Sequence, residues 1–178
     1  MCPYATPGIV EKHEIDPELF VKMYSKLDYS KLSKICCTLE GLMEFILEFY
    51  SDKIMSFEQY KKALCCLVLT FKGLSHAELD RILDFKPGEW EVFIAIYKSI
   101  LFTFQGLWKI SNEVFIKTVE KAFLMDAAYT KLIHQAIYLS LEKTPPSVRS
   151  LEELTNHLYA AREFFRLKEN IASIDKFV

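Results

Sequence analysis

The chain of 178 residues is poor in glycine, with five, and in proline, with six. So few glycines leave little for a phosphate-binding loop, and neither G-x-x-x-x-G-K-[ST] nor G-x-G-x-x-G occurs. A low content of both residues beside 26% charged residues also argues against disorder or a low-complexity array. These absences predict an ordered globular protein without a nucleotide-binding loop, and no cofactor is expected.

Three further absences concern charge, targeting and membrane spans. The 22 basic residues are balanced by 24 acidic ones, which argues against nucleic-acid binding by bulk charge. Residues 1–8 have neither the basic nor the apolar region of a secretory signal. The apolar run Leu64–Leu69 is far shorter than the roughly twenty residues that span a bilayer. We therefore expect a soluble, cytoplasmic protein that does not bind membranes.

Apolar residues are abundant: hydrophobic residues make up 51% of the chain and aromatic residues 14%. A chain of this length buries about 70% of its unfolded surface, so its core needs no disulfide or metal. Four of the five cysteines form the adjacent pairs Cys36–Cys37 and Cys65–Cys66. Zinc sites usually space cysteines as C-x₂₋₄-C, and neighbours on a helix point about 100° apart. Reduced core thiols are therefore expected, and no metal site.

Helical periodicity covers most of the chain. Helices are predicted over 17–27, after the Asp16–Pro17 start signal, and over 30–50. The capping boxes Ser56–Gln59 and Ser75–Glu78 predict helices over 56–72 and 75–84, with Gly73 as the left-handed residue that ends the first. A further helix is predicted over 87–101.

The period changes after Leu101. Residues 101–104 and 107–110 alternate as two strands around Gln105–Gly106, which predicts a β-hairpin. Helices follow from a cap at Ser111–Asn112 and over 125–141, and after the linker Thr144–Ser147 come two more, over 150–178.

The order of three helices and a hairpin is that of a winged helix. The predicted fold is mainly α: a helical bundle with a winged-helix centre and a C-terminal hairpin resembling a helical repeat. The predicted divisions are an N-terminal helical segment (1–54), a winged-helix-like module (55–124) and a helical, repeat-like segment (125–178).

A DNA-reading winged helix needs basic or amide side chains on its third helix and phosphate contacts beside it. Here that helix begins with Glu89 and Glu91 and carries only Lys98, while the hairpin adds only Lys109. Protein contact is therefore favoured over nucleic-acid binding, which is kept as an alternative. A helical bundle that binds a small ligand is a second alternative, because the aromatic content would line a pocket.

Three segments in order resemble a known family. They are Lys62–Leu79 with its Gly-Leu-Ser-x-x-Glu-Leu corner, Gly106–Val119, and Arg149–Leu158 with the pattern Arg-x-x-Glu-Glu-Leu-x-x-His-Leu. Together they are similar to the winged-helix and early helical-repeat region of NACHT-type (STAND) signal-transduction ATPases, as in nephrocystin-3-like tetratricopeptide-repeat proteins. Asn112 stands where that family often has histidine, and the Walker A and Walker B elements are absent.

The resemblance implies a regulatory and scaffolding role without catalysis. It implies a protein partner or neighbouring domains of the same family, and from the resemblance alone a ciliary association. The C-terminal helices carry more apolar residues than one buried face needs, which predicts an end face covered by another repeat, a partner or a second copy. The candidate interaction residues are Phe164, Phe165, Leu167, Ile171 and Phe177.

Catalytic constellations are weak in this sequence. His134 and His157 lack a second histidine or a carboxylate three or four residues further on, and His76 follows the cap Ser75 and is expected to be exposed. All three are therefore interpreted as structural or solvated. The acid pairs Glu89/Glu91 and Glu152/Glu153 are placed in first helical turns, where the helix dipole favours carboxylates. The protein is therefore predicted not to be an enzyme.

Overall fold

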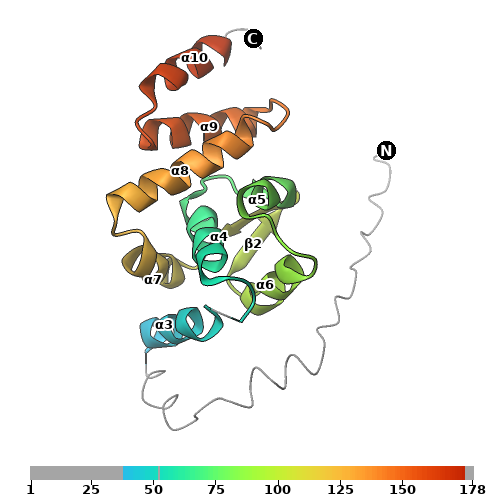
Figure 1. Cartoon of the computed structure of the whole chain (residues 1–178), viewed down its shortest axis with the longest axis vertical. Helices are drawn as coiled ribbons and strands as arrows, with labels where there is room; N and C mark the ends of the chain where they lie inside the picture. Colours follow the sequence, from blue (N-terminus) through green and yellow to red (C-terminus); the bar gives the residue numbers. More distant parts are fainter. Residues whose placement is uncertain (1–37, 52, 175–178) are drawn as a thin grey trace, which may run out of the picture.

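The computed structural model describes residues 38–51 and 53–174, and these are mainly helical with a small antiparallel sheet (Figure 1). The helices expected over 17–27 and at the start of 30–50 lie outside the described residues. In chain order the elements are α3 (Leu39–Tyr50), α4 (Phe57–Leu69), β1 (Leu74–Ser75), α5 (His76–Leu83), α6 (Glu89–Tyr97), β2 (Leu101–Phe104), β3 (Leu107–Ile110), α7 (Glu113–Phe123), α8 (Ala127–Leu141), α9 (Val148–Ala160) and α10 (Phe164–Ile174).

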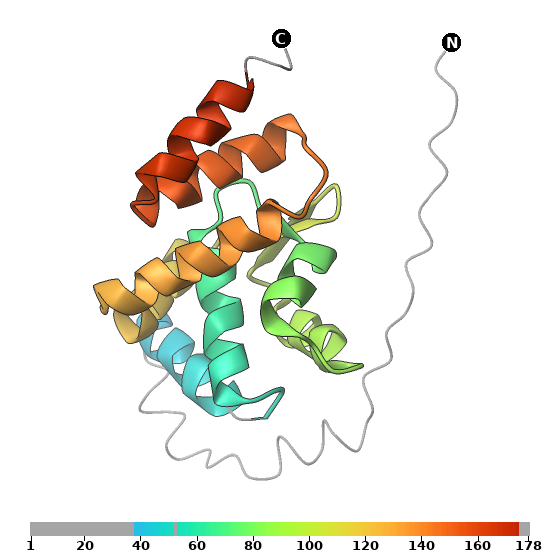
Figure 2. The same cartoon turned by 45° about the horizontal axis from the view of Figure 1, so that its top comes forward.

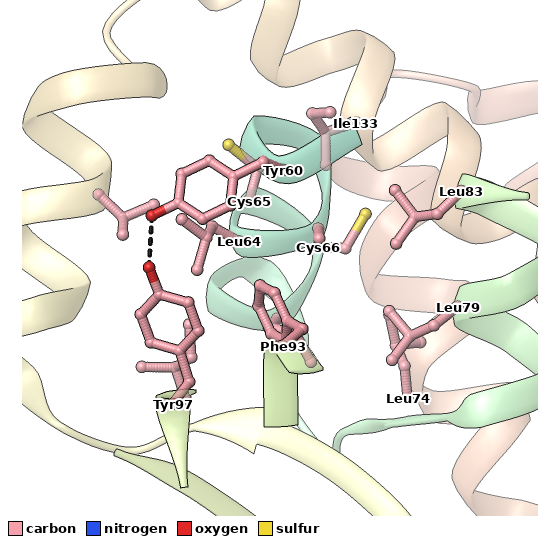
Figure 3. Packing of buried hydrophobic residues seen from close by; sticks show 14 of the residues in the cluster. Tyr60, Leu64, Cys65, Cys66, Leu74, Leu79, Leu83, Phe93, Tyr97 and Ile133 are labelled. Atoms are coloured by element: carbon pink, nitrogen blue, oxygen red, sulfur yellow. Dashed lines mark hydrogen bonds between the residues drawn. The ribbon is translucent and has the colours of Figure 1, made fainter. Parts of the chain in front are cut away.

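Helix α4 is the centre of the fold, because Ala63 to Leu67 are fully buried in an unbroken run. A helix that is apolar on all sides is stable only when other elements surround it. Figure 3 shows Leu64 and both cysteines of α4 among side chains from α5, α6 and α8. The hydroxyl of Tyr60 hydrogen-bonds to that of Tyr97 and lies 3.0 Å from the carbonyl oxygen of Leu47, so α4 is joined to α6 and α3.

The sheet has the order β1–β3–β2, with both pairings antiparallel. The predicted hairpin is confirmed: Phe104 pairs with Leu107, and the two turn residues Gln105 and Gly106 have φ of 51° and 75°. Such left-handed values are those of a type I′ turn, which matches the twist of the strands. Strand β1 was not predicted, because two residues carry no periodicity.

Two predicted features at the ends of α4 are wrong in detail. Helix α4 ends at Leu69, with an extended Thr70 as its C-cap, so Gly73 does not terminate it. Instead Gly73, with φ of 97°, lies just before β1 where a Cβ would be 3.1 Å from that of Leu107. The Ser56 hydroxyl does cap α4, but the side-chain amide of Gln59 donates to the Leu83 carbonyl at 2.9 Å instead of completing a capping box.

Other start and stop signals are confirmed. Ser75 and Glu78 form a complete capping box, and Asn112 caps α7 by accepting a hydrogen bond from the Phe115 N–H at 2.9 Å. The Thr144–Ser147 segment separates α8 from α9, as its prolines predicted.

The C-terminal helices α9 and α10 are attached through α8 to the elements packed around α4, which we call the central unit. Ile133, Ile137 and Leu141 of this helix belong to the main core, whereas Tyr138 forms a small second cluster with Leu158 and Ala161. Helix α10 packs on α9 at the end of the molecule opposite α3, as Figures 1 and 2 show. The same helix α8 is therefore part of both clusters.

Candidate functional site

The predicted interaction residues lie on and around α10, and most are exposed. Phe164 is 58%, Phe165 76% and Ile171 51% exposed, whereas Leu167 is half-buried and packs on the small cluster of α8 and α9. Phe177 lies outside the described residues. Tyr159 of α9, which is not one of the candidate interaction residues, is 68% exposed and its ring meets that of Phe164 edge to face at 6.4 Å. Three of the candidate residues on α10 are thus exposed apolar side chains, and their role in an interaction stays a prediction.

A turn in the left-handed region creates this end face. Arg162 has φ of 60°, and the N–H of Glu163 donates to the carbonyl of Leu158 at 2.9 Å, so the chain reverses within three residues after α9. The side-chain amide of Asn170 donates to the Thr155 hydroxyl at 2.9 Å and holds α10 against α9. Phe164 and Phe165, the first two residues of α10, remain largely exposed.

Beside Phe165 lies a groove of about 810 Å³ between the end of α8, α9 and α10. Its lining combines apolar side chains with polar and charged ones, of which Arg166 and Glu142 form an ion pair of 3.0 Å. The apolar lining residues are Leu141, Pro146, Leu151, Leu154, Leu158 and Phe165. Apolar side chains together with polar ones are the composition of a protein-binding groove.

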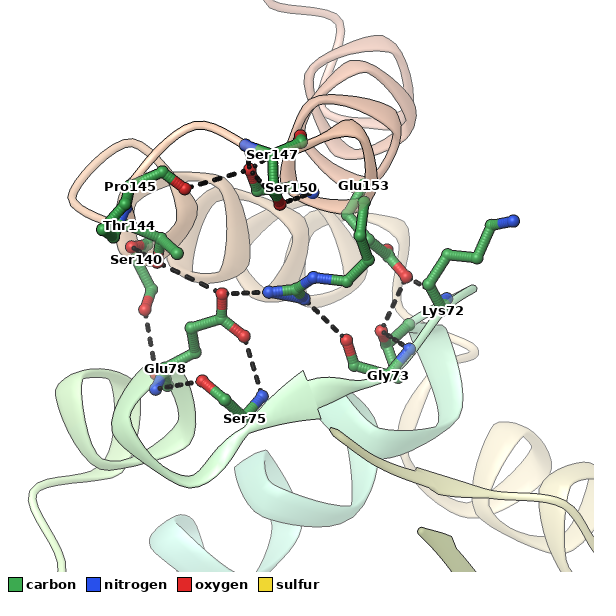
Figure 4. A network of polar contacts seen from close by, with 12 residues as sticks. Lys72, Gly73, Ser75, Glu78, Ser140, Thr144, Pro145, Ser147, Ser150 and Glu153 are labelled. Carbon is green, nitrogen blue, oxygen red and sulfur yellow. Dashed lines mark hydrogen bonds and ion pairs between the residues drawn. The ribbon is translucent and has the colours of Figure 1, made fainter. Parts of the chain in front are cut away.

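A buried polar junction sets the position of α9, and Figure 4 shows it. The carboxylate of Glu78, fully buried in α5, forms an ion pair with Arg149 of α9 and accepts hydrogen bonds from the Thr144 hydroxyl at 3.1 Å and the Ser75 N–H at 2.7 Å. Arg149 also donates to the carbonyl of Gly73 at 2.8 Å. The Glu78 carboxylate therefore completes the capping box of α5 and also binds α9 through Arg149.

The second half of the junction is centred on Glu153, which is also fully buried. One carboxylate oxygen accepts hydrogen bonds from the Thr70 hydroxyl at 3.0 Å and from the Lys72 N–H, directly after α4. The other lies 3.2 Å from Nε2 of His157, whose Nδ1 lies 2.7 Å from Nδ1 of His134. A carboxylate and two imidazoles thus form one chain from the α4 corner to α8.

The protonation of this chain follows from its surroundings. Burial, and to a smaller extent the neighbouring His157 ring, lowers the pKa of His134 to about 4. Burial alone would raise the pKa of Glu153, but hydrogen bonds from His157 and the Lys72 N–H outweigh it and leave that pKa below its usual value. At neutral pH Glu153 is therefore ionised and His134 is neutral.

Two sequence interpretations are corrected here. Glu153 is not a solvated first-turn acid, because α9 begins at Val148 and the carboxylate is buried in its second turn. His157 does have a carboxylate partner, four residues before it instead of after it. The spacing of Glu153 and His157 was visible in the sequence, but the contribution of His134 from another helix was not. His76 is exposed, as predicted, and stacks on Trp90 at 5.6 Å.

A smaller apolar groove, of about 380 Å³, lies among α3, α4 and α7. Phe57 and Phe123 meet edge to face there, with ring centroids 6.1 Å apart, and Leu47 contributes to the wall. Glu48 and Lys121 stand among its lining residues.

The described residues contain no group of three histidine, cysteine or acidic side chains placed to hold a metal ion. Cys65 and Cys66 are buried and unpaired, as predicted for core thiols, and burial raises the pKa of Cys65 to about 12. Such thiols are protonated and poorly nucleophilic at neutral pH. Cys36 and Cys37 lie outside the described residues.

Within 38–51 and 53–174, no helix is both long and apolar enough to cross a bilayer. Comparisons of the chain with protein-family models, curated proteins and solved structures gave no match.

Proposed function

We propose that the chain is a non-enzymatic protein-interaction and scaffold module, in which a winged-helix-like unit positions a repeat-like pair of helices for a partner. The observation that carries the proposal is the exposed apolar end of α9 and α10, where Phe165 is 76% exposed beside the groove of about 810 Å³. Isolated apolar residues on a surface are ordinary, but a cluster of aromatic rings at a groove is typical of a binding site.

The element order supports the winged-helix part of the proposal. Helix α4, β1, α5, α6 and the β2–β3 hairpin follow one another as in that fold, and β1 joins the hairpin through its pairing with β3. The resemblance to NACHT-type ATPases remains a proposal of the same kind. It would make this module the regulatory piece that lies between a nucleotide-binding core and helical repeats.

The chemistry of the groove indicates an amphipathic helix as the partner segment. The lining leucines supply apolar contacts, while Arg166 and Glu142 among the lining residues offer one charge of each sign. A helix of the next repeat, or of another protein, with an apolar stripe and flanking polar residues fits such a groove.

The decisive test uses two apolar residues of equal exposure. Phe165, at 76%, lines the groove, and Val148, at 77%, stands at the start of α9 outside it. Partners enriched from cells with the full chain are purified and titrated calorimetrically against wild type, Phe165→Lys and Val148→Lys. We expect Phe165→Lys to weaken binding at least tenfold, about 1.4 kcal/mol, and Val148→Lys to change it less than twofold. Equal loss in both variants would contradict the proposal.

The non-enzymatic part has its own test. We expect calorimetric titration with Mg-ATP to give no binding heat, because the chain has no phosphate-binding glycine loop. Binding of ATP in the micromolar range would overturn this part. Nucleic-acid binding remains the alternative, checked by a gel shift with duplex DNA at two salt concentrations.

A second candidate function, binding of a small apolar ligand, is favoured by the groove at Phe57 and Phe123. Octanol is a suitable probe, because it is neutral and of the right size for about 380 Å³. Saturable binding by wild type that is lost in Phe123→Ala would support this function.

A further inference from the structure

Strand β2 forms an open edge of the sheet. It pairs with β3 on one side, and no strand within the described residues pairs with its other side. Phe102 and Phe104 of this strand are 50% and 60% exposed, and Thr103 between them is exposed as well. An open edge that bears large apolar side chains is a ready template for pairing with another strand.

The register determines which backbone groups face outward. The N–H of Ser111 donates to the carbonyl of Ile100 at 3.2 Å, so these two residues form a hydrogen-bonded pair. In a two-residue hairpin the residues that flank the turn, here Phe104 and Leu107, form another such pair. Hydrogen-bonded pairs alternate along antiparallel strands. The N–H and C=O groups of Leu101 and Thr103 therefore point away from β3, toward the open edge.

Strand β2 is short, but it lacks three of the features by which natural sheets block association, namely charge, proline and a bulge. Strand β2 has no charged residue and no proline, and its pairing runs without a bulge from Leu101–Ile110 to Phe104–Leu107. Two copies of this strand would meet without burying or opposing a charge.

We propose that β2 pairs antiparallel with β2 of a second copy of this chain, about a twofold axis at Phe102. The outward groups of Leu101 then bond to those of the partner's Thr103, and the reverse, which gives four backbone hydrogen bonds. Phe102 faces the partner's Phe102 in the central pair without hydrogen bonds, and the two sheets become one sheet of six strands.

The available area indicates a weak dimer. A buried phenylalanine contributes about 200 Å², so the exposed halves of Phe102 and Phe104 offer about 400 Å² over both copies. Stable dimers bury about 1,200 Å² or more. The association is therefore expected to be weak and to depend on protein concentration.

Sedimentation equilibrium of the full chain from about 10 to 500 μM tests this association. The average mass of wild type is expected to rise toward that of a dimer, and Thr103→Pro is expected to remain monomeric. Proline removes only the outward N–H at this position, which the β2–β3 pairing does not use. Phe165→Lys is the control, because it alters the α10 surface and leaves the edge intact. A wild type that stays monomeric throughout overturns the proposal.

A disulfide test does not depend on the folding of the proline variant. Opposed residues without hydrogen bonds have Cα atoms about 4.5 Å apart, within disulfide range. Both variants are made in a background with Cys2, Cys36 and Cys37 replaced by serine. Phe102→Cys is expected to form a covalent dimer on mild oxidation. Phe104→Cys, at a position that is similarly exposed but lies off the twofold axis, is not expected to form one. Equal crosslinking of both variants, or of neither, overturns the register. Loss of dimer in Phe165→Lys alone would assign self-association to α10 instead.

Discussion

Nδ1 of His134 lies 2.7 Å from Nδ1 of His157, so a single proton occupies the space between the two rings. His157 carries its own ring proton on Nε2, because the partner of this nitrogen, Glu153, is ionised and can only accept a hydrogen bond. A second proton on His134 would go to Nε2 and place a positive charge in this mostly buried site, which burial disfavours.

This relationship predicts acid sensitivity. The folded-state pKa of His134, about 4, is below its unfolded value near 6.5, so the unfolded chain binds more protons between these values. Stability from this group is full above pH 6.5 and is lost as the pH falls toward 4. Glu153, whose pKa is also lowered, adds a loss in the same direction at still lower pH.

Melting temperatures from pH 7.5 to 4.5 check this expectation. His134→Gln keeps a neutral hydrogen-bonding side chain and is expected to flatten the fall between pH 6.5 and 5, whereas the exposed His76→Gln is expected to follow wild type. Parallel curves for wild type and His134→Gln would contradict the assignment.

Two adjacent acids on α9 are expected to differ strongly in their contribution to stability. Glu153→Ala leaves the Thr70 hydroxyl, the Lys72 N–H and His157 without their acceptor in a buried site, so we expect a loss of about 3 kcal/mol. Glu152→Ala removes only a surface ion pair with Lys72, at 3.3 Å and about half exposed, and is expected to cost less than 1 kcal/mol. Urea denaturation of both variants measures the difference, and similar midpoints would refute the role of the buried carboxylate.

Two glycines with positive φ are expected to respond differently to alanine. At Gly106 a Cβ has no neighbour within 4 Å, so Gly106→Ala costs about 1 kcal/mol for the left-handed backbone alone. At Gly73 the Cβ would also lie 3.1 Å from that of Leu107 and 3.2 Å from the Trp108 carbonyl oxygen. Gly73→Ala is therefore expected to lose about 2 kcal/mol or more and to displace β1. The free energies of unfolding check the order, which equal losses would contradict.

The buried thiols are expected to resist modification. In a variant with Cys2, Cys36 and Cys37 replaced by serine, Cys65 and Cys66 should react with a disulfide reagent only as fast as the protein unfolds, because both are buried and burial raises the pKa of each. The rate of colour release in native buffer and in denaturant measures this. Rapid reaction in native buffer would show that the α4 environment is open.

Local signals in the sequence predicted much of the architecture. The caps at Ser75 and Asn112, the Gln105–Gly106 turn and the Thr144–Ser147 linker each act over a few residues, and the structure has an element boundary at each. Strand β1 could not be predicted, because Leu74 and Ser75 form a strand only through their pairing with β3.

The polar junction was less predictable for the same reason. Arg149 meets Glu78 across 71 residues, and neither side chain differs in sequence from an ordinary exposed charge. Glu153 and His157 are four residues apart, so their pairing was accessible from helical spacing, but the burial of both depends on the loop after α4. The candidate interaction residues Phe164, Phe165 and Ile171 were chosen from a single signal, the excess of apolar residues on α10, and all three are exposed.

The sequence distance within the junction has a consequence for how the protein is made. The hydroxyl of Thr70 binds a carboxylate 83 residues further along the chain. During synthesis that carboxylate leaves the ribosome long after α4, β1 and α5 have emerged, so these elements first meet without their buried acceptor. Contacts so distant in sequence form late, because a long loop must close before they are made. We therefore expect the docking of α9 to be a late step of folding, so that the α10 surface forms on a chain whose central unit is already assembled.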